Sequence, residues 1–230
     1  MSHVYVIGDV HGCYYTMMAL MDRVGPGAAD TVVFLGDLIN KGPYSKKVVD
    51  QVIEWKEKGF KVTSLVGNHE LKMLNMIGNE NVSELDLYWK LYSAQGAYEE
   101  FFNADYEIPK HYLSFFKGLK PYIESDNHLL VHAGVDFSLS APFEDLKSLT
   151  TIRDWAENYA PSVVNGKTIV HGHQNCTVMQ AQKAVDSGAK VIPLDTGCVY
   201  YGKKQGMGYL TAFSLSDEKL YHQINIEGFD

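Results

Sequence analysis

Polar residues of the kind that bind metals or transfer protons stand directly behind short apolar runs, and this placement constrains the fold most. Five such clusters occur, at residues 8–12, 36–37, 67–70, 132–134 and 171–173. Each contains glycine, which lets the backbone turn sharply and approach a ligand closely. In α/β sheets, ligands bind at the carboxyl ends of the strands. We therefore expect the five clusters to meet in space, although they are far apart in the sequence.

The pattern of apolar residues predicts alternating strands and helices in the first seventy residues. Strands are predicted at residues 3–7, 31–35 and 61–66, and helices at 14–24 and 46–58. This βαβαβ order implies a parallel sheet with right-handed crossovers. Further on, helical patterns cover residues 71–77, 83–102 and 110–119, and strands are predicted at 129–132, 168–171, 191–194, 208–214 and 220–226. We predict an α/β fold with residues 1–230 as one domain and a helical insertion at about 71–118.

The predicted insertion is rich in aromatic residues. They are Tyr88, Trp89, Tyr92, Phe101, Phe102, Tyr112, Phe115 and Phe116. The simpler interpretation is that they pack the core of a helical subdomain, and the alternative is that a few of them line a substrate groove.

Carboxylate, imidazole and amide groups in one cleft are ligands for divalent first-row metals such as Mn, Fe, Zn or Ni. Asp9, His11 and Asp37 can form one metal site. Asp37 can bridge to a second site completed by Asn68, His132 and His173. A shared carboxylate would hold two cations roughly 3.5–4 Å apart, which is the spacing of two-metal hydrolases. The residues therefore point to a dinuclear centre.

Each cluster alone has a plainer interpretation, as a turn, a loop or a core histidine such as His132. Together they favour the metal site. Asp9 and Asp37, brought close behind apolar strands, would form a like-charge pair that needs a cation.

Composition excludes several classes of protein. The chain of 230 residues is 46% hydrophobic, and its formal net charge of −8 argues against non-specific nucleic-acid binding. No apolar run approaches the roughly 20 residues that cross a bilayer, and no signal peptide is evident at the N-terminus. Cys13, Cys176 and Cys198 are an odd, widely spaced set, which fits reduced thiols in a cytoplasm. The sequence does not indicate an oligomeric state.

The clusters, taken in order, resemble the signature of the calcineurin-like metallophosphoesterases. The matching stretches are Gly8-Asp9-Val10-His11-Gly12, Gly36-Asp37-Leu38, Gly67-Asn68-His69-Glu70, His132-Ala133-Gly134 and Gly172-His173. They are most similar to the phosphoprotein phosphatase branch, with its bacterial and phage members and the symmetrical diadenosine tetraphosphatases. A later stretch, residues 194–200, resembles a strand and turn of the bacterial branch. The resemblance implies a sandwich of two mixed β-sheets flanked by helices, with a dinuclear site usually active with manganese.

The resemblance also implies roles for individual residues. Asp9, His11 and Asp37 would bind the first metal, and Asp37, Asn68, His132 and His173 the second. His69 matches the family's general acid, and the alternatives are another metal ligand or a surface histidine at a helix start. Arg153 resembles an arginine that clamps the phosphate, although a surface arginine paired with Asp154 or Glu157 has the same pattern. His171 would be a neighbour of the site, and Asn175 stands where many nucleases of the superfamily have a further histidine.

One motif departs from the family. Protein phosphatases have Gly-Asp-x-x-Asp-Arg-Gly, whereas this chain has Asn40 and Lys41 in place of the Asp-Arg pair. Asn40 can accept a hydrogen bond but has no charge to stabilise imidazolium, so we expect His69 to titrate lower than in an Asp-bearing relative. Lys41 offers a point charge to phosphate where arginine offers a planar fork.

The resemblance implies hydrolysis of a phosphoester by direct attack of a metal-bridged hydroxide. The first expectation is a serine/threonine protein phosphatase with broad phosphomonoesterase activity, acting on a phosphorylated protein or a small phosphoester. The alternative is a hydrolase of dinucleoside polyphosphates such as diadenosine tetraphosphate. A third reading, a binding module without catalysis, predicts missing ligands or a missing acid, and none of these residues is missing.

Overall fold

The computed structural model describes residues 2–77, 99–103 and 107–228, and within these ranges the strands form two sheets. The five-stranded sheet has the order β3-β2-β1-β8-β9. Its strands are β1 (Val4–Ile7), β2 (Thr31–Phe34), β3 (Lys61–Ser64), β8 (Tyr209–Ser214) and β9 (Lys219–Ile224). β1, β2 and β3 are parallel, whereas β8 is antiparallel to β1 and to β9.

The second sheet has four strands in the order β4-β5-β6-β7. They are β4 (Tyr122–Glu124), β5 (His128–Val131), β6 (Thr168–His171) and β7 (Val191–Pro193). β4 is antiparallel to β5, and β5, β6 and β7 are parallel. Both sheets are therefore mixed, as predicted.

The two sheets pack face to face through an apolar core. Alternate side chains of each strand point to opposite faces of a sheet. Val6 and Val33 point inward from the five-stranded sheet and pack in one cluster with Leu130, Val170 and Ile192 of the other sheet. The helix α7 (Val178–Asp186) contributes to the same cluster.

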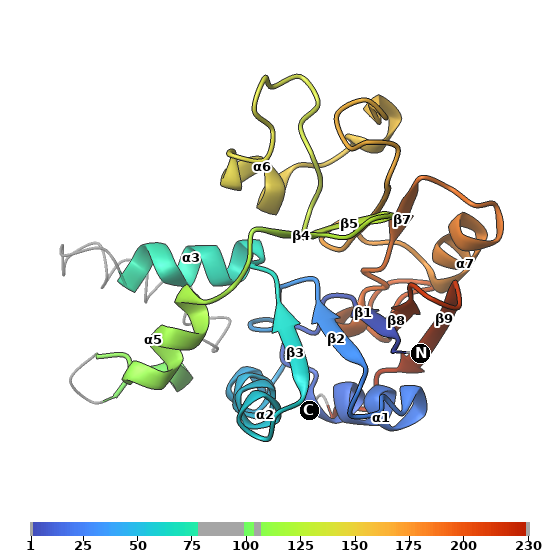
Figure 1. Cartoon of the computed structure of the whole chain (residues 1–230). Helices are drawn as coiled ribbons and strands as arrows, with labels where there is room; N and C mark the ends of the chain where they lie inside the picture. The colour runs from blue at the N-terminus through green and yellow to red at the C-terminus, as the bar shows by residue number, and fades with distance from the viewer. Residues whose placement is uncertain (1, 78–98, 104–106, 229–230) are drawn as a thin grey trace.

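Helices cover the outer faces (Figure 1). On the five-stranded sheet lie α1 (Tyr14–Val24) and α2 (Ser45–Glu57), and on the four-stranded sheet lies α6 (Leu146–Thr151). At one side of the sheets lie α3 (Asn68–Ile77) and α5 (Lys110–Lys117). Short 3-10 segments are η2 (Glu99–Phe101), η3 (Ala156–Asn158) and η4 (Cys198–Tyr200). The α/β sandwich flanked by helices is confirmed.

Several predicted boundaries are wrong. α3 begins at Asn68 and not at residue 71, because the Gly67-Asn68-His69-Glu70 stretch forms its first turn. β4, α6 and α7 were not predicted, although Thr177 and Gln180 form a capping box that marks the start of α7 in the sequence. Most of the predicted helix at 83–102 lies outside the described residues.

Aromatic side chains of the predicted insertion that fall in the described ranges are part of the core. Phe101, Tyr112, Phe115 and Phe116 are buried in the cluster on the outer face of the five-stranded sheet. This agrees with the simpler interpretation in that they are core residues, but they pack in one cluster with α1, α2 and the five-stranded sheet and not in a separate helical subdomain. Tyr88, Trp89 and Tyr92 lie outside the described residues.

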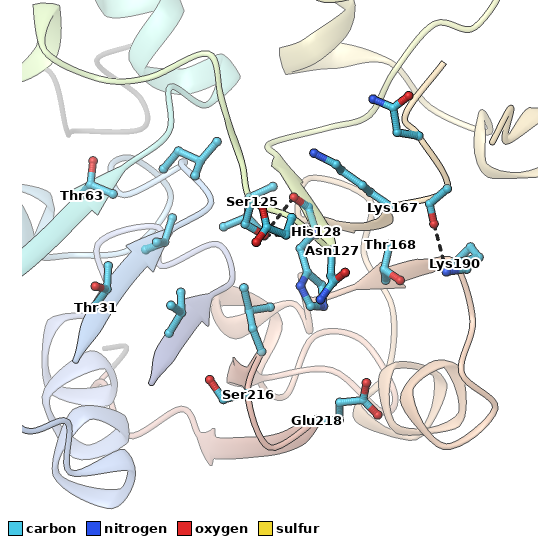
Figure 2. Close-up of a pocket in the computed structure, with 18 residues that line it drawn as sticks. Thr31, Thr63, Ser125, Asn127, His128, Lys167, Thr168, Lys190, Ser216 and Glu218 are labelled. Atoms are coloured by element: carbon cyan, nitrogen blue, oxygen red, sulfur yellow. Dashed lines mark hydrogen bonds between the residues drawn. The ribbon is translucent and has the colours of Figure 1, made fainter. Parts of the chain in front are cut away.

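The two edges of the sandwich differ. At the edge where the parallel strands begin, a cavity of about 850 Å³ is lined by the first residues of four strands, Val4, Thr31, His128 and Thr168 (Figure 2). At the other edge, where these strands end, the predicted polar clusters meet. Within the described residues, no helix is long and apolar enough to cross a bilayer.

Candidate metal centre

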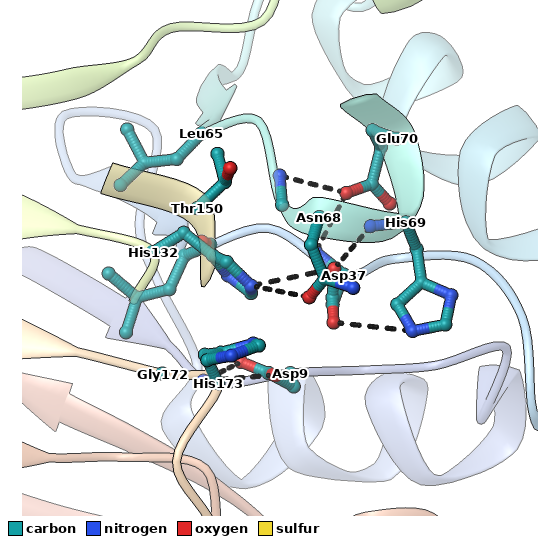
Figure 3. Close-up of polar contacts among 12 residues, drawn as sticks. Asp9, Asp37, Leu65, Asn68, His69, Glu70, His132, Thr150, Gly172 and His173 are labelled. Atoms are coloured by element: carbon teal, nitrogen blue, oxygen red, sulfur yellow. Dashed lines mark hydrogen bonds and ion pairs between the residues drawn. The ribbon is translucent and has the colours of Figure 1, made fainter. Parts of the chain in front are cut away.

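The structure brings all six candidate metal ligands together at the carboxyl edge of the sandwich. Asp9 follows β1, Asp37 follows β2, His132 follows β5 and His173 follows β6, while Asn68 begins α3, the next element after β3. Figure 3 shows Asp37, Asn68 and His132 pointing toward one another, with Asp9 and His173 beside them. Asp9, His11, Asp37, Asn68 and His132 are buried.

The first group of donor atoms is centred on one oxygen of Asp37. His11 Nε2 lies 3.5 Å from Asp37 Oδ2, and His69 Nε2 lies 3.8 Å from the same oxygen. Asp9 Oδ2 lies 4.0 Å from His11 Nε2. The Asp9 carboxylate is oriented by the backbone N–H of His173, whose nitrogen is 3.1 and 3.2 Å from its two oxygens.

The second group is centred on the other oxygen of Asp37. His132 Nε2 lies 3.5 Å from Asp37 Oδ1 and 3.3 Å from Asn68 Oδ1. His173 Nε2 is buried and has no hydrogen-bond partner within the described ranges. Asp37, His132 and His173 offer donor atoms that lie within 4.8 Å of one another, as do His11, Asp37 and His69. Asp37 is common to both groups.

Hydrogen bonds made by the far ring nitrogens orient two of the histidines. His11 Nδ1 lies 3.0 Å from the carbonyl oxygen of Ile39, and His132 Nδ1 lies 2.9 Å from that of Leu35. A carbonyl can only accept, so Nδ1 carries the proton and the Nε2 lone pair faces Asp37. Metal-binding histidines are held in this way by a partner on the other ring nitrogen.

His69 has the opposite arrangement. Its Nδ1 lies 2.8 Å from the amide Nδ2 of Asn40, which donates to it, so the neutral ring carries its proton on Nε2. That proton faces the site, where Asp37 Oδ2 is 3.8 Å away. In its neutral form His69 thus presents a hydrogen-bond donor to the site, whereas His11 and His132 present electron pairs.

Glu70 holds the loop that carries Asp37. Its carboxylate oxygens accept hydrogen bonds from the backbone N–H groups of Asp37, Leu38 and Gly67, at 2.8–2.9 Å, and from that of Ile39 at 3.3 Å. Burial, and then the charge of Asp37, raises the pKa of Glu70 to about 8. Glu70 is part of the Gly67-Asn68-His69-Glu70 motif, but the motif alone predicts no role for it.

Glycine permits the close approach of backbone to carboxylate at two points. A Cβ atom on Gly67 would lie 2.2 Å from Asp37 Oδ1, and one on Gly172 would lie 2.1 Å from Asp9 Oδ1. Both distances are far below van der Waals contact. Any side chain at these positions would displace a candidate ligand.

Backbone strain is concentrated in the same loops. Eight non-glycine residues of the described ranges have positive φ, and five of them are candidate site residues. These are His11, Asp37, Asn40, Lys41 and His173. Such conformations cost about 1–3 kcal/mol each and persist where the surrounding structure enforces them, which is common at functional sites.

The electrostatics of the cluster fit a bound cation. Burial raises the pKa of Asp37 to about 7, and burial together with the nearby Asp195 and Asp37 carboxylates raises that of Asp9. Burial also lowers the pKa of His132 to about 3. Without a cation, the pocket therefore opposes ionised carboxylates, while its histidines stay neutral and free to donate electron pairs.

The Lys41 ammonium shows that a positive charge is accepted at this position. Its Nζ lies 2.7 Å from His11 Nε2, and its charge lowers the pKa of the Asp37 carboxyl. Oxygen and imidazole donors, a buried unpartnered nitrogen on His173 and an ammonium among the carboxylates all fit divalent first-row metals.

The pKa of His69 is low mainly because the side chain is buried. Burial is the largest effect and the Lys41 charge the next, and they lower the pKa of His69 to about 2. That His69 titrates lower than in a relative with Asp at position 40 stays a prediction.

Arg153 lies at the rim. Its side chain is exposed, and its positive charge contributes to the lowered pKa values of His132 and His173. Among the described residues, the guanidinium forms no ion pair, so the alternative pairing with Asp154 or Glu157 is not seen. It also lines a neighbouring cavity of about 470 Å³.

His171 is a neighbour of the cluster, as expected. Its ring packs edge-on against Trp155, with the centroids 5.2 Å apart, and its Nδ1 lies 3.0 Å from the carbonyl of Gly172.

Asp195 is a buried carboxylate that the sequence analysis did not single out. It accepts hydrogen bonds from the Gly197 N–H, at 3.0 Å, and from the Asn175 amide, and its charge helps to raise the pKa of Asp9. It follows the β7 strand as Asp9 and Asp37 follow theirs, so the same signal would have found it.

The fold and the cluster define an α/β metallohydrolase, in which loops at the strand ends gather a dinuclear set of ligands. The chain belongs to the calcineurin-like phosphoesterase family, which matches residues 2–208. It is a metal-dependent phosphoester hydrolase, and the family implies divalent metal ions at the cluster.

Relatives and solved structures narrow the comparison. The asymmetrical bis(5'-nucleosyl)-tetraphosphatase PrpE of Bacillus velezensis is 28% identical over 89% of this chain and 88% of its own length. A crystal structure of a protein assigned as a diadenosine tetraphosphatase has a TM-score of 0.70 at 23% identity, covering 99% of this chain and 95% of that one. A serine/threonine phosphatase of Saccharomyces cerevisiae, similar to human PP5, has a TM-score of 0.61 at 16% identity, covering 100% and 82%. The two structures share the fold.

Proposed function

We propose that this protein hydrolyses dinucleoside polyphosphates such as diadenosine tetraphosphate at a dinuclear metal centre. The observation that carries the proposal is that Asp37 belongs to both donor groups, one on each of its oxygens. The proposed ligands are Asp9, His11 and Asp37 for one cation and Asp37, Asn68, His132 and His173 for the other.

The substrate class is supported by the relatives that match along most of the chain. The Bacillus velezensis protein, a tetraphosphatase by name, matches 89% of this chain. The likeness to the yeast serine/threonine phosphatase concerns the fold. Asn40 and Lys41, in place of the Asp-Arg pair of protein phosphatases, also distinguish this chain from that group. The alternative raised by the sequence analysis is therefore better supported than its first expectation.

Two divalent cations, with manganese as the first choice, would lower the pKa of a water molecule and neutralise phosphate oxygens. The chain's own contribution is to place their ligands. Glu70, through four backbone N–H groups, fixes the Asp37 loop, and carbonyl oxygens fix the rings of His11 and His132.

His69 is proposed as the proton donor. When the P–O–P bond breaks, the oxygen of water ends on one phosphorus, and the leaving phosphate oxygen takes a proton. The donating form would be the imidazolium, in which Nδ1–H donates to the Asn40 side chain, turned to present its amide oxygen, and Nε2–H faces the leaving oxygen. After the transfer the ring is neutral. General acids of this kind contribute typically ~100- to 10,000-fold.

Lys41 and Arg153 are proposed to bind phosphate. The Lys41 ammonium already lies inside the cluster, 2.7 Å from His11 Nε2, and would move to the phosphate when a cation takes its place. Arg153 is exposed, its charge acts on His132 and His173, and it has no carboxylate partner among the described residues. A phosphate bound at the centre would then contact the side chains of both Lys41 and Arg153.

A substrate panel tests the proposal. With manganese present, we expect kcat/KM for diadenosine tetraphosphate to exceed that for a phosphoserine peptide by about tenfold or more, a difference of about 1.4 kcal/mol in transition-state binding. Chromatography of the products separates ATP plus AMP from two ADP and so locates the cleaved bond. A preference for the phosphopeptide would overturn the proposed substrate. Stoichiometric metal with no turnover on either substrate, or on p-nitrophenyl phosphate, would favour a binding module.

A further inference from the structure

The ammonium groups of two lysines lie near the ring of Tyr200, and one of these lysines also contacts the candidate metal centre. The Lys41 Nζ that lies 2.7 Å from His11 Nε2 is also 6.0 Å from the centroid of the Tyr200 ring. The Nζ of Lys204 is 3.8 Å from the same centroid. One aromatic ring thus connects a cation inside the centre with a second cation outside it.

We propose that Lys204, held by the ring of Tyr200, binds a phosphate group beyond the one that is hydrolysed. Tyr200 and Lys204 then form a subsite that selects substrates whose scissile phosphate is part of a polyphosphate chain. This proposal rests on the proposed function and names the part of the chain that distinguishes a polyphosphate from a phosphomonoester.

The position of Tyr200 is fixed by buried structure next to the centre. It ends the segment η4, whose Cys198 and Val199 are buried, and its N–H donates to the carbonyl of Gly197 at 2.8 Å. Gly197 has a φ of +66°, which favours glycine, and its N–H is held by the Asp195 carboxylate at 3.0 Å. The ring is therefore anchored to the loop that also contributes a buried carboxylate to the centre.

The position of Lys204 is set by the same turn. Its backbone N–H donates to the carbonyl of Tyr200 at 3.0 Å, so the turn brings its side chain back over the ring. The side chain is exposed and can be reached by a substrate. The local chain thus presents an ammonium group at a fixed place beside the centre.

The ammonium groups on Tyr200 are available to an anion. Within the described ranges, Lys46, Lys58 and Lys167 form ion pairs with carboxylates, whereas Lys41 and Lys204 form none. An aromatic face holds a cation through its quadrupole and leaves the ammonium protons free for a charged acceptor. A polyphosphate has several negatively charged phosphates along its length, so Lys204 can bind one phosphate while Lys41 binds another. A phosphomonoester has no such second group.

A second lysine among aromatic rings lies nearby but is less suited to this role. The Nζ of Lys47 lies over the rings of Tyr14, Tyr15 and Tyr44, at 4.4–5.9 Å from the centroids, and also donates to the Tyr15 hydroxyl at 3.2 Å. It is shared among three side chains, and within the described residues no ion pair or side-chain hydrogen bond links it to the candidate metal ligands, whereas Lys41 contacts His11.

Binding of two non-hydrolysed anions tests the proposal without relying on turnover. Calorimetry of the manganese-loaded protein gives Kd for orthophosphate and for diimidotriphosphate, the P–N–P analogue of tripolyphosphate, with equal free manganese in cell and syringe. We expect wild type to bind diimidotriphosphate more tightly. The measured quantity is the ratio of Kd for orthophosphate to Kd for diimidotriphosphate. We expect Lys204→Ala to lower this ratio about tenfold, because a charge-assisted hydrogen bond is lost. Tyr200→Leu should lower it as well, and Lys204→Arg should restore it.

The control is Lys219→Ala. Lys219 also lies over a tyrosine ring, that of Tyr221, at 4.7 Å, but on β9, away from the centre. It should keep the wild-type ratio. A wild-type ratio in both Lys204→Ala and Tyr200→Leu, or an equal decrease in Lys219→Ala, would overturn the subsite. If the ratio falls as expected but diadenosine tetraphosphate is not hydrolysed, the proposed function fails while the subsite stands. If the tetraphosphate is hydrolysed and the ratio is unchanged, the subsite fails while the proposed function stands.

Discussion

The same strands end in two very different regions at the two edges of the sandwich. At their amino ends, a cavity of about 850 Å³ contains Lys167, Lys190, His128 and Glu218 (Figure 2). Two of these side chains have partners outside any cluster: Lys167 pairs with Glu124, and Lys190 donates to a backbone carbonyl. At their carboxyl ends, donor atoms from four strand-end loops and from the start of α3 converge within a few ångströms (Figure 3).

The strand β5 shows the contrast within a few residues. His128 begins the strand at the cavity, and His132 follows its other end at the centre. His132 is fully buried, with Nδ1 fixed by a carbonyl and Nε2 aimed at Asp37 and Asn68. Among the described residues, the candidate metal groups lie at the carboxyl edge. Convergence of donor atoms, and not the volume of a cavity, therefore marks the functional site.

The largest expected effect separates the two edges most sharply. Asp37→Asn removes charge from the residue shared by both donor groups, so we expect turnover to fall to background. Glu218→Gln at the cavity should leave kcat/KM at the wild-type value. Steady-state kinetics on one phosphoester measure both. Substantial activity in the first variant, or a matching loss in the second, would break the comparison.

The second largest effect is expected when a histidine at the centre, His69, is compared with one at the cavity, His128. His69→Gln should lower kcat by roughly 100- to 10,000-fold for a poor leaving group, because the proton donor is lost. The loss should be smaller for p-nitrophenyl phosphate, whose leaving group needs less protonation. His128→Gln serves as the matched change at the cavity. An equal loss on both substrates would argue that His69 binds metal instead.

Substitution of Glu70 tests whether this residue holds the metal ligands in place, and Glu124 serves as the control. In Glu70→Gln, one acceptor oxygen becomes an NH2 group, which cannot accept from the backbone N–H groups of the Asp37 loop. Groups that orient metal ligands typically contribute about 10- to 100-fold in metal affinity or activity, and we expect a loss of that size. Manganese titration of activity measures it, with Glu124→Gln as the control. Unchanged manganese dependence would remove Glu70 from the support of the site.

The smallest expected effect concerns pH. In Asn40→Asp, a carboxylate would accept from His69 Nδ1–H and favour imidazolium, which raises the pKa of His69 from its lowered value of about 2. A raised pKa keeps the doubly protonated ring present to higher pH, so the limb of the pH–rate profile that reports His69 should move to higher pH. Asn127→Asp at the cavity should leave the profile in place. A profile that does not move in Asn40→Asp would separate Asn40 from the mechanism.

The sequence predicted the centre better than its surroundings, and for a physical reason. Asp9, Asp37, His132 and His173 stand just behind apolar runs, and strand ends that share an edge must meet. The role of Glu70 depends on a contact with a loop 33 residues away, which no local pattern encodes. The approach of Lys41 to Tyr200 is likewise set by packing alone.

Some elements were missed although their signals were present. The capping box of Thr177 and Gln180 marks the start of α7, and Asp195 follows an apolar run as Asp37 does. The left-handed backbone of His11 and His173 could not be predicted, because such conformations in non-glycine residues are imposed by tertiary structure.

Metal stoichiometry tests the central claim most directly. Calorimetric titration of metal-free protein with manganese should give two ions per chain. Protons should be released on binding, because the pKa of Asp37 is raised to about 7 in the metal-free cluster and its ligand form is ionised. Glu218→Gln should give the same count, and Asp37→Asn should bind neither ion tightly. Fewer than two ions in wild type, or two ions still bound by Asp37→Asn, would contradict a centre built around Asp37.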